Sequence, residues 1–195
     1  MVIGVLGLQG DVREHLASLR CAGMEGRVVR TPADLAELSG LILPGGESTA
    51  ISLLGEGGIF AALRGCVRDG FPLFGTCAGM VLLAAEVEGR DEPHLGAIDI
   101  TVARNASGRQ VDSFETELDV DGVGKKLCAV FIRAPFITRV GPGVRVLAEH
   151  EGVPVMAEQG NVLVASFHPE LTEDPRIHRY FGAIAERHEQ EVRRS

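Results

Sequence analysis

Residues 71–83 have the sequence FPLFGTCAGMVLL, in which an apolar strand, a G-x-C-x-G turn and an apolar helix follow one another directly. This is the pattern of a nucleophile elbow with cysteine in place of serine. Gly75 and Gly79 suit a turn that crowds a strand against a helix. The pattern predicts Cys77 at a strand end with a helix N-terminus beneath it, where the thiolate is favoured. On this segment alone, the alternative of a small core cysteine beside a tight turn remains open.

The first half of the chain alternates apolar strands with helices around that elbow. We predict strands at residues 2–8, 27–30, 41–43 and 72–74, and helices at residues 12–21, 59–69 and 78–86. Asp11 is expected to cap the first helix, Thr31 to open another with Pro32 in its first turn, and Ser48 to cap a short one. Strands that are apolar on both faces are typical of a parallel sheet covered by helices. We therefore expect a doubly wound α/β fold, with its site at the carboxyl ends of the strands.

The second half of the chain has a different pattern. Short alternating segments, which favour antiparallel or mixed pairing, occur at residues 98–102, 115–118, 129–132 and 144–148. Residues 153–158 and 162–167, separated by Gln159 and Gly160, predict a hairpin. A polar helix is expected at residues 175–191. Because no linker, repeat or low-complexity segment interrupts the sequence, we expect one domain over residues 1–195.

Charge and cysteine content exclude several kinds of protein. The net charge of −8 argues against a general role on nucleic acid or an anionic membrane, because phosphates would be repelled. The four cysteines form no C-x-x-C pair, and no histidine cluster has zinc-ligand spacing, so we expect no metal site. Scattered cysteines are typical of reduced thiols in a cytoplasmic protein. The N-terminal apolar run of about eight residues is too short to span a membrane.

A histidine and a carboxylate follow a late strand. Residues 162–170, VLVASFHPE, end in His168, Pro169 and Glu170. A general base must be held in one tautomer, and a carboxylate on its second ring nitrogen does that. Taken alone, a histidine near a strand end is more often a surface residue, and the signal gains weight only together with the cysteine elbow. The other five histidines lack this context, and we expect them to be structural or solvated.

A glycine pair follows the strand at residues 41–43, in the sequence LILPGGEST. Such a loop lets a backbone N–H approach a developing oxyanion from the side opposite the elbow, where the N–H of Ala78 is the other donor. An ordinary turn with a serine cap explains the loop equally well. It is not a Walker A loop, because no G-K-[ST] follows.

The motifs together resemble a known family. The segments GTCAG (75–79) and SFHPELT (166–172) are similar to the class I, triad-type glutamine amidotransferases. Four further segments, together with residues 166–172, narrow the resemblance to the glutaminase subunits of pyridoxal 5′-phosphate synthase. They are GVLGLQG (4–10), LPGGEST (43–49), GRQVDSF (108–114) and VFIRAP (130–135). The match runs from residue 2 to about residue 174 and implies a flavodoxin-like, three-layer fold.

The resemblance implies a role for individual residues. Cys77 would be the nucleophile, with His168 and Glu170 completing the triad. The oxyanion hole would be formed by Gly46 and Ala78. Glutamine would be bound by residues on three segments, namely Gly46, Glu47, Ser48, Arg104, Ile132 and Arg133. The charges suit this substrate, since Glu47 can take an ammonium and the arginines a carboxylate. Where the family has a bulky residue, this chain has Ala106.

The resemblance also implies a partner and no cofactor. Glutamine would be hydrolysed to glutamate and ammonia, and the ammonia passed to a separate (β/α)₈-barrel synthase subunit in a large hetero-oligomer. Three alternatives remain: another amidotransferase subunit, such as the histidine-pathway glutaminase; a cysteine hydrolase or chaperone-like protein with the same elbow; and a regulatory binding subunit with a dead site. Residues 108–114 argue against the first, the H-P-E segment and the glycine loop against the second, and the intact triad against the third.

Overall fold

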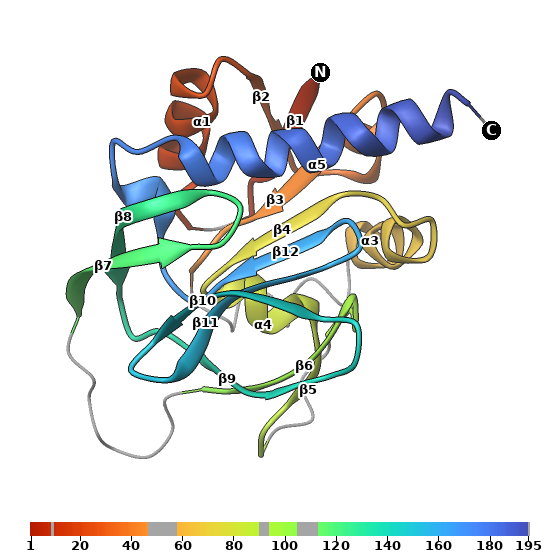
Figure 1. Ribbon diagram of the computed structural model, residues 1–195. Coiled ribbons are helices and arrows are strands. Elements are labelled where there is room, and N and C mark those ends of the chain that lie inside the picture. The colour runs from red at the N-terminus through yellow and green to blue at the C-terminus, as the bar shows by residue number, and fades with distance from the viewer. Residues whose placement is uncertain (9, 47–57, 90–93, 105–112, 195) are drawn as a thin grey trace.

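The computed structural model describes residues 1–8, 10–46, 58–89, 94–104 and 113–194. Within these ranges the largest sheet has seven strands. They are β1 (Val2–Leu6), β2 (Glu25–Val29), β3 (Gly40–Leu43), β4 (Leu73–Thr76), β10 (Arg145–His150), β11 (Val153–Gln159) and β12 (Val162–Ala165). Their order across the sheet is β10-β11-β12-β4-β3-β1-β2. Strands from both ends of the chain therefore meet at its centre, where β12 lies between β4 and β11 (Figure 1).

Most of this sheet is parallel, as predicted. Strands β2, β1, β3, β4 and β12 pair in parallel, whereas β11 and β10 are antiparallel additions at one edge. The predicted hairpin at residues 153–158 and 162–167 is confirmed as β11 and β12, in which Met156 pairs with Ala165. Parallel pairing brings the carboxyl ends of β3, β4 and β12 to one edge of the sheet, where a doubly wound fold carries its site.

Helices cover both faces of the sheet. In Figure 1, α1 (Val12–Cys21) and α5 (Arg176–Val192) lie above it, and α4 (Ala78–Leu83) lies below, with α3 (Ile59–Arg68) at the right. Because side chains alternate along a strand, neighbouring residues enter different cores. Ile42 and Phe74 join the core that contains the helices α1 and α5. Leu41, Leu43 and Leu73 join the core that contains α3 and α4. These two cores make the fold three-layered.

Two smaller sheets flank the main one. A mixed sheet of β5 (Ala84–Val87), β6 (Ile98–Ala103) and β9 (Phe136–Val140) packs on the α4 side. An antiparallel hairpin of β7 (Phe114–Val120) and β8 (Gly124–Phe131) packs on the α1 and α5 side. These are the antiparallel and mixed additions that the second half of the sequence predicts.

Some local predictions are wrong. The helix expected at residues 78–86 ends at Leu83, because residues from Ala84 onward pair with β6 and tertiary pairing overrides helix propensity. The segment after Thr31 is a short 3-10 helix, η1 (Pro32–Leu35), rather than an α-helix. Strand β9 was not expected, since its five residues lack an alternating pattern. The helix expected after Ser48 lies outside the described residues.

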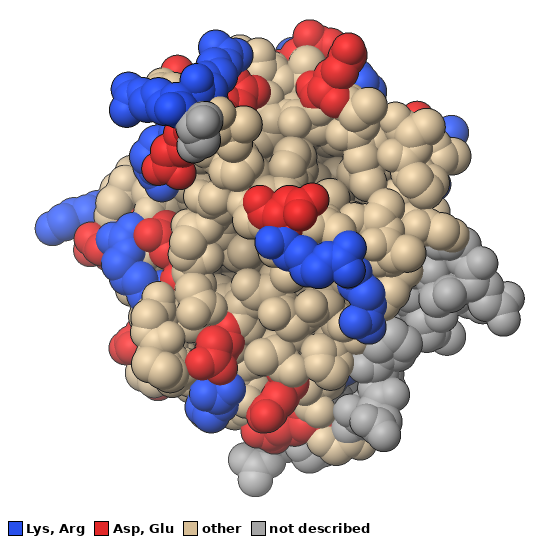
Figure 2. All heavy atoms as spheres, turned by 90° about the vertical axis from the view of Figure 1, so that its right-hand side faces the viewer, with Lys and Arg blue, Asp and Glu red and all other residues tan. Residues whose placement is uncertain are grey.

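Charged side chains are mixed on the face that Figure 2 shows, which is the right-hand side of Figure 1. Acidic and basic groups lie beside one another on that face, between wide areas of uncharged surface. None of the described helices has the length and apolar character needed to cross a membrane.

Candidate active site

The elbow after β4 has the backbone geometry that its sequence predicts. Cys77 has φ 48° and ψ −106°, which is a conformation that residues other than glycine rarely adopt. A Cβ on Gly75 would lie 2.5 Å from the carbonyl of Gly79. A Cβ on Gly79 would overlap the Leu43 carbonyl oxygen of β3. Both glycines are therefore required by close backbone contact, and Cys77 is held in a strained position at the strand end.

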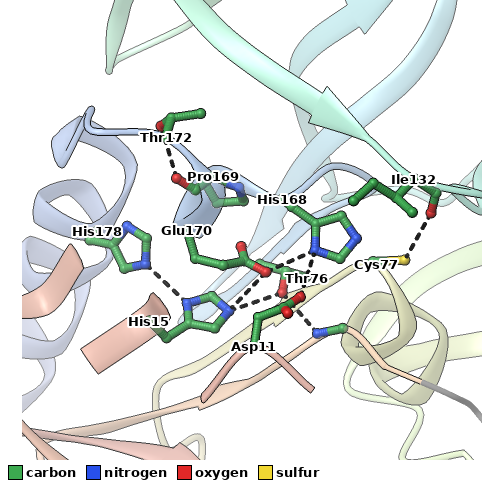
Figure 3. Close-up of polar contacts among 11 residues, drawn as sticks. Asp11, His15, Thr76, Cys77, Ile132, His168, Pro169, Glu170, Thr172 and His178 are labelled. Atoms are coloured by element: carbon green, nitrogen blue, oxygen red, sulfur yellow. Dashed lines mark hydrogen bonds and ion pairs between the residues drawn. The ribbon is translucent and has the colours of Figure 1, made fainter. Parts of the chain in front are cut away.

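Neighbouring strands bring Cys77 and His168 to the same edge of the sheet. Thr76 of β4 pairs with Ala165 of β12, so that the two site segments start from adjacent positions. The N–H of Cys77 donates to the Ala165 carbonyl at 2.8 Å, and the N–H of His168 donates to the Val130 carbonyl of β8 at 2.8 Å. These bonds fix both residues by their backbones. Figure 3 shows the His168 ring between Cys77 and Glu170.

His168 and Glu170 form a buried hydrogen-bonded dyad. His168 Nδ1 lies 2.8 Å from Glu170 Oε1, and both side chains are almost fully buried. Burial alone would lower the pKa of His168, but the contacts with Cys77 and Glu170 outweigh it and raise the pKa to about 10. Burial alone would raise the pKa of Glu170, but His15 and His168 hold it well below its usual range. The dyad therefore favours an imidazolium paired with a carboxylate.

Asp11 contacts the imidazole of His168 as well. It occupies the N-cap position of α1, as predicted, but its side chain makes no capping hydrogen bond. Its Oδ2 instead lies 3.3 Å from His168 Nδ1, and burial, with Glu170, raises the pKa of Asp11. Donor atoms of Asp11, His168 and Glu170 fall within 4.8 Å of one another, a spacing that a metal ion could use. Because Nδ1 shares its proton with Glu170 at 2.8 Å, we assign the group to hydrogen bonding.

The glycine pair after β3 lies against the side chains of Cys77 and His168. A Cβ on Gly45 would be 2.5 Å from His168 Cε1 and 3.2 Å from Cys77 Cβ. The N–H of Gly45 donates to Thr76 Oγ1 at 3.2 Å, so that it is engaged within the protein. Gly46 follows, exposed and with φ 155°, and Ala78 is the first residue of α4. Glu47 and Ser48 lie outside the described residues.

The segment after β8 borders the cysteine. Cys77 Sγ lies 4.0 Å from the carbonyl oxygen of Ile132, a residue that is 38% exposed. Arg133 is exposed and has φ 45°. Ala103 of β6 pairs with Phe136 of β9, which places the chain at Arg104 beside the segment that holds Arg133. Ala106 and residues 108–112 lie outside the described residues.

Comparison with known proteins identifies the family of this chain. A model of the SNO glutamine amidotransferase family matches residues 5–186.

The chain belongs to this family.

A protein described as pyridoxal 5′-phosphate synthase subunit PdxT, from Carboxydothermus hydrogenoformans, is 53% identical over 183 residues, which cover 93% of this chain and 96% of the relative. The protein of the same description from Streptomyces coelicolor is 54% identical over 185 residues, covering 93% of this chain and 92% of the relative.

Solved structures confirm the fold class. A crystal structure of a glutamine amidotransferase, 52% identical, superposes with a TM-score of 0.89 and covers 95% of this chain and 100% of its own. A putative GMP synthase subunit from Thermoplasma acidophilum is only 17% identical, yet it covers 100% of this chain and 98% of its own with a TM-score of 0.72. The second likeness concerns the fold alone.

Three buried polar residues beside the His168–Glu170 dyad were not predicted as site residues from the sequence. Thr76 and two histidines, His15 and His178, are all 0% exposed and connect to Glu170. The two histidines were expected to be structural or solvated, and no motif marks them. His15 lies inside α1, far from residue 170 in sequence, and His178 lies on α5, the helix that follows Glu170, so the packing of α1 and α5 brings them together.

Proposed function

We propose that this protein is the glutamine-hydrolysing subunit of a pyridoxal 5′-phosphate synthase and that Cys77, His168 and Glu170 perform the hydrolysis. Relatives described as PdxT, about half identical to this chain over nearly its whole length, support the assignment to vitamin B6 biosynthesis. The observation that carries the chemistry is the buried 2.8 Å contact between His168 and Glu170 beside a cysteine on a strained turn.

The first half of the reaction is acyl transfer to the cysteine. The Cys77 thiolate attacks the side-chain amide carbon of glutamine and forms a C–S bond, and the carbonyl electrons move to oxygen. Backbone N–H groups of Gly46 and Ala78 stabilise that oxyanion. His168 gives its proton to the amide nitrogen as the C–N bond breaks, and ammonia leaves. The γ-glutamyl thioester and a neutral imidazole remain.

The second half of the reaction regenerates the enzyme. Neutral His168 removes a proton from water, whose oxygen attacks the thioester carbon. The C–S bond breaks, glutamate leaves, and the thiolate pairs again with the imidazolium. Glu170 remains a carboxylate throughout, because it orients the ring and stabilises its charge rather than accepting the proton.

Glutamine is held by the segments around the cysteine. We assign its α-ammonium to Glu47 and its α-carboxylate to the guanidinium groups of Arg104 and Arg133, which form charge-assisted hydrogen bonds. Gly46, Ser48 and Ile132 complete the set. The backbone of Ile132 is close to Cys77 Sγ, at 4.0 Å, which supports its place in this set.

The product ammonia is passed to a separate synthase subunit, for which we propose a (β/α)₈ barrel in a large hetero-oligomer. We also propose that residues 1–195 form one glutaminase domain and that it acts in the cytoplasm. The four cysteines, all free, are compatible with a reducing compartment.

The test is glutamate release from glutamine, measured with and without a pyridoxal phosphate synthase subunit. Wild type should become more active with the partner, and Cys77→Ala should lose activity by about 10³-fold or more. Cys66→Ala, which removes a half-buried thiol elsewhere, is the matched control and should behave as wild type.

Two results would change the proposal. Retained activity in Cys77→Ala would show that the triad is wrong. Wild-type activity that is indifferent to the synthase subunit would keep the triad but replace the vitamin B6 assignment with that of another amidotransferase.

A further inference from the structure

We propose that His15 is a positioning residue for glutamine hydrolysis. Its ring N–H, in a tautomer set by His178, connects the Glu170 carboxylate to the glycine loop at Gly45 and Gly46. The inference rests on the proposed function, because it assigns a role in that reaction. It concerns a side of Glu170 that faces away from Cys77 (Figure 3).

His15 connects three separate elements at the centre of the molecule. It lies on α1 with 0% exposure. Its Nε2 is 3.4 Å from Glu170 Oε1 and 3.2 Å from Thr76 Oγ1, at the end of β4. Its Nδ1 is 3.0 Å from His178 Nε2 on α5. Since both ring nitrogens are engaged and the site is closed to solvent, the ring has one orientation that satisfies all three partners.

The surroundings of His178 decide which nitrogen of His15 carries the proton. Burial, followed by the nearby His15, lowers the pKa of His178 to about 3, so that His178 is neutral at working pH. Its Nδ1 is buried and has no hydrogen-bond partner among the described residues. A buried lone pair without a partner is tolerated better than a buried N–H without one, so the proton belongs on Nε2.

The tautomer of His15 follows from that assignment. His178 donates its Nε2–H to His15 Nδ1, which must accept. With Nδ1 as the acceptor, the N–H of the His15 ring is on Nε2, directed between Glu170 Oε1 and Thr76 Oγ1. Two histidines therefore direct an N–H to one carboxylate oxygen, since His168 Nδ1 lies 2.8 Å from the same atom.

Glu170 depends strongly on this second donor. Its other oxygen, Oε2, is buried and has no hydrogen-bond partner among the described residues. Without His15, the carboxylate would be held through His168 alone and could rotate or take up a proton. The N–H of Gly45 donates to the same Thr76 hydroxyl at 3.2 Å. The same ring thus positions the general base and the backbone that leads to Gly46.

Four titratable groups act on Glu170 or share its contacts. They are His15 on α1, His178 on α5, His168 after β12 and Asp11 before α1. Cys77 acts on His168 from the opposite side of that ring. Loss of the His15 N–H removes a donor to the carboxylate, so the acid limb of the pH profile should move to higher pH.

The experiment compares His15→Leu, His15→Gln and His178→Leu in the complex with the synthase subunit. For His15→Leu we expect kcat to fall by about 10- to 100-fold, the size that a charge-assisted hydrogen bond carries, with KM within about twofold of wild type. The acid limb of kcat/KM should move to higher pH. The amide N–H of His15→Gln can reach the position of Nε2, so this variant should restore most of kcat and return the acid limb of kcat/KM toward its wild-type position. His178→Leu should lower kcat by about 3- to 10-fold.

A matched control separates positioning from general packing. His188 on α5 is hydrogen-bonded to Asn161 at 3.2 Å and packs on Phe71, at the end of β4 opposite the cysteine. His188→Leu should leave kcat and the pH profile unchanged. A wild-type pH profile and kcat in His15→Leu, or no rescue by His15→Gln in a folded protein, would overturn the inference. If Cys77→Ala were also active, the proposed function would fail as well; if Cys77→Ala were inactive, only the role of His15 would fail.

Discussion

Two buried imidazoles share one oxygen of Glu170, and they differ in their other partners. His168 follows a strand, lies beside Cys77 and has its pKa raised to about 10. His15 lies inside α1 and contacts Thr76 and His178 rather than the cysteine. In the proposed mechanism, the first belongs to the reacting side of the site and the second to its supporting side. The contrast teaches that strand ends deliver the groups that react, whereas helices packed behind the sheet hold them.

The reacting side should show the largest effect when its carboxylate loses its charge. In Glu170→Gln the amide cannot stabilise the His168 imidazolium, and the N–H of His15 loses its charged acceptor. We expect kcat for glutamate release in the synthase complex to fall by about 10³- to 10⁴-fold. Stopped assays with purified, folded variant would measure it. A fall of less than tenfold would mean that Glu170 is not the residue that orients His168.

A smaller effect should follow from displacing the backbone of the glycine loop at Gly45 and Gly46. Gly10 has φ 88°, and a Cβ there would overlap the Gly45 carbonyl oxygen. Gly10→Ala should therefore displace the glycine loop and lower kcat by about 10- to 100-fold.

Gly23→Ala is the control for this substitution. Gly23 has a similar φ of 81°, but a Cβ there meets nothing within 4 Å. Its only cost should be the backbone conformation, about 1 kcal/mol of unfolding free energy, with unchanged activity. Equal activity in the two variants would show that the close contact of Gly10 with Gly45 is not needed for activity.

The supporting side should have its clearest effect on the unfolding free energy at acidic pH. The folded state holds His178 neutral with a pKa of about 3, against 6.5 for the ordinary residue, because it is buried. Between these values the unfolded chain binds a proton that the folded chain does not, so the unfolding free energy falls as pH falls through this window. His178→Leu should remove a slope of at most about 1.4 kcal/mol per pH unit.

Urea unfolding of wild type and His178→Leu across the same window measures that slope. Glu170 contributes in the same direction below its ordinary value of 4.5, because its folded pKa is lowered, and this part remains in both proteins. Parallel stability curves for the two proteins would contradict the neutral state assigned to His178.

The difference between the two sides also explains what the sequence could predict. The parallel strands, the elbow and the H-P-E segment carry local signals, namely apolar runs and glycines at close contacts, and the structure has them where they were expected. His15 and His178 carry no local signal, since a histidine inside an amphipathic helix looks the same whether it is solvated or buried. Their role arises from the packing of α1 and α5 against the end of β4.

Non-local pairing accounts for the errors in secondary structure. Residues 84–87 continue an apolar helix in sequence, yet Ala84 pairs with Ile98 of β6. Asp11 is at the N-cap position of α1 as expected, but its carboxylate makes no capping hydrogen bond and lies 3.3 Å from His168 Nδ1. In both cases the competing contact comes from a distant segment, which a local pattern does not contain.

The most direct test of the account is to find which cysteine reacts with a glutamine analogue that carries an electrophilic carbon at the side-chain position. Exposure alone would favour Cys21 and Cys128, which are exposed, over Cys77, which is 9% exposed. The account predicts one adduct in the synthase complex, mapped by mass spectrometry to the peptide containing Cys77, and no adduct in His168→Asn. Labelling that follows exposure, or that reaches Cys77 equally without His168, would contradict it.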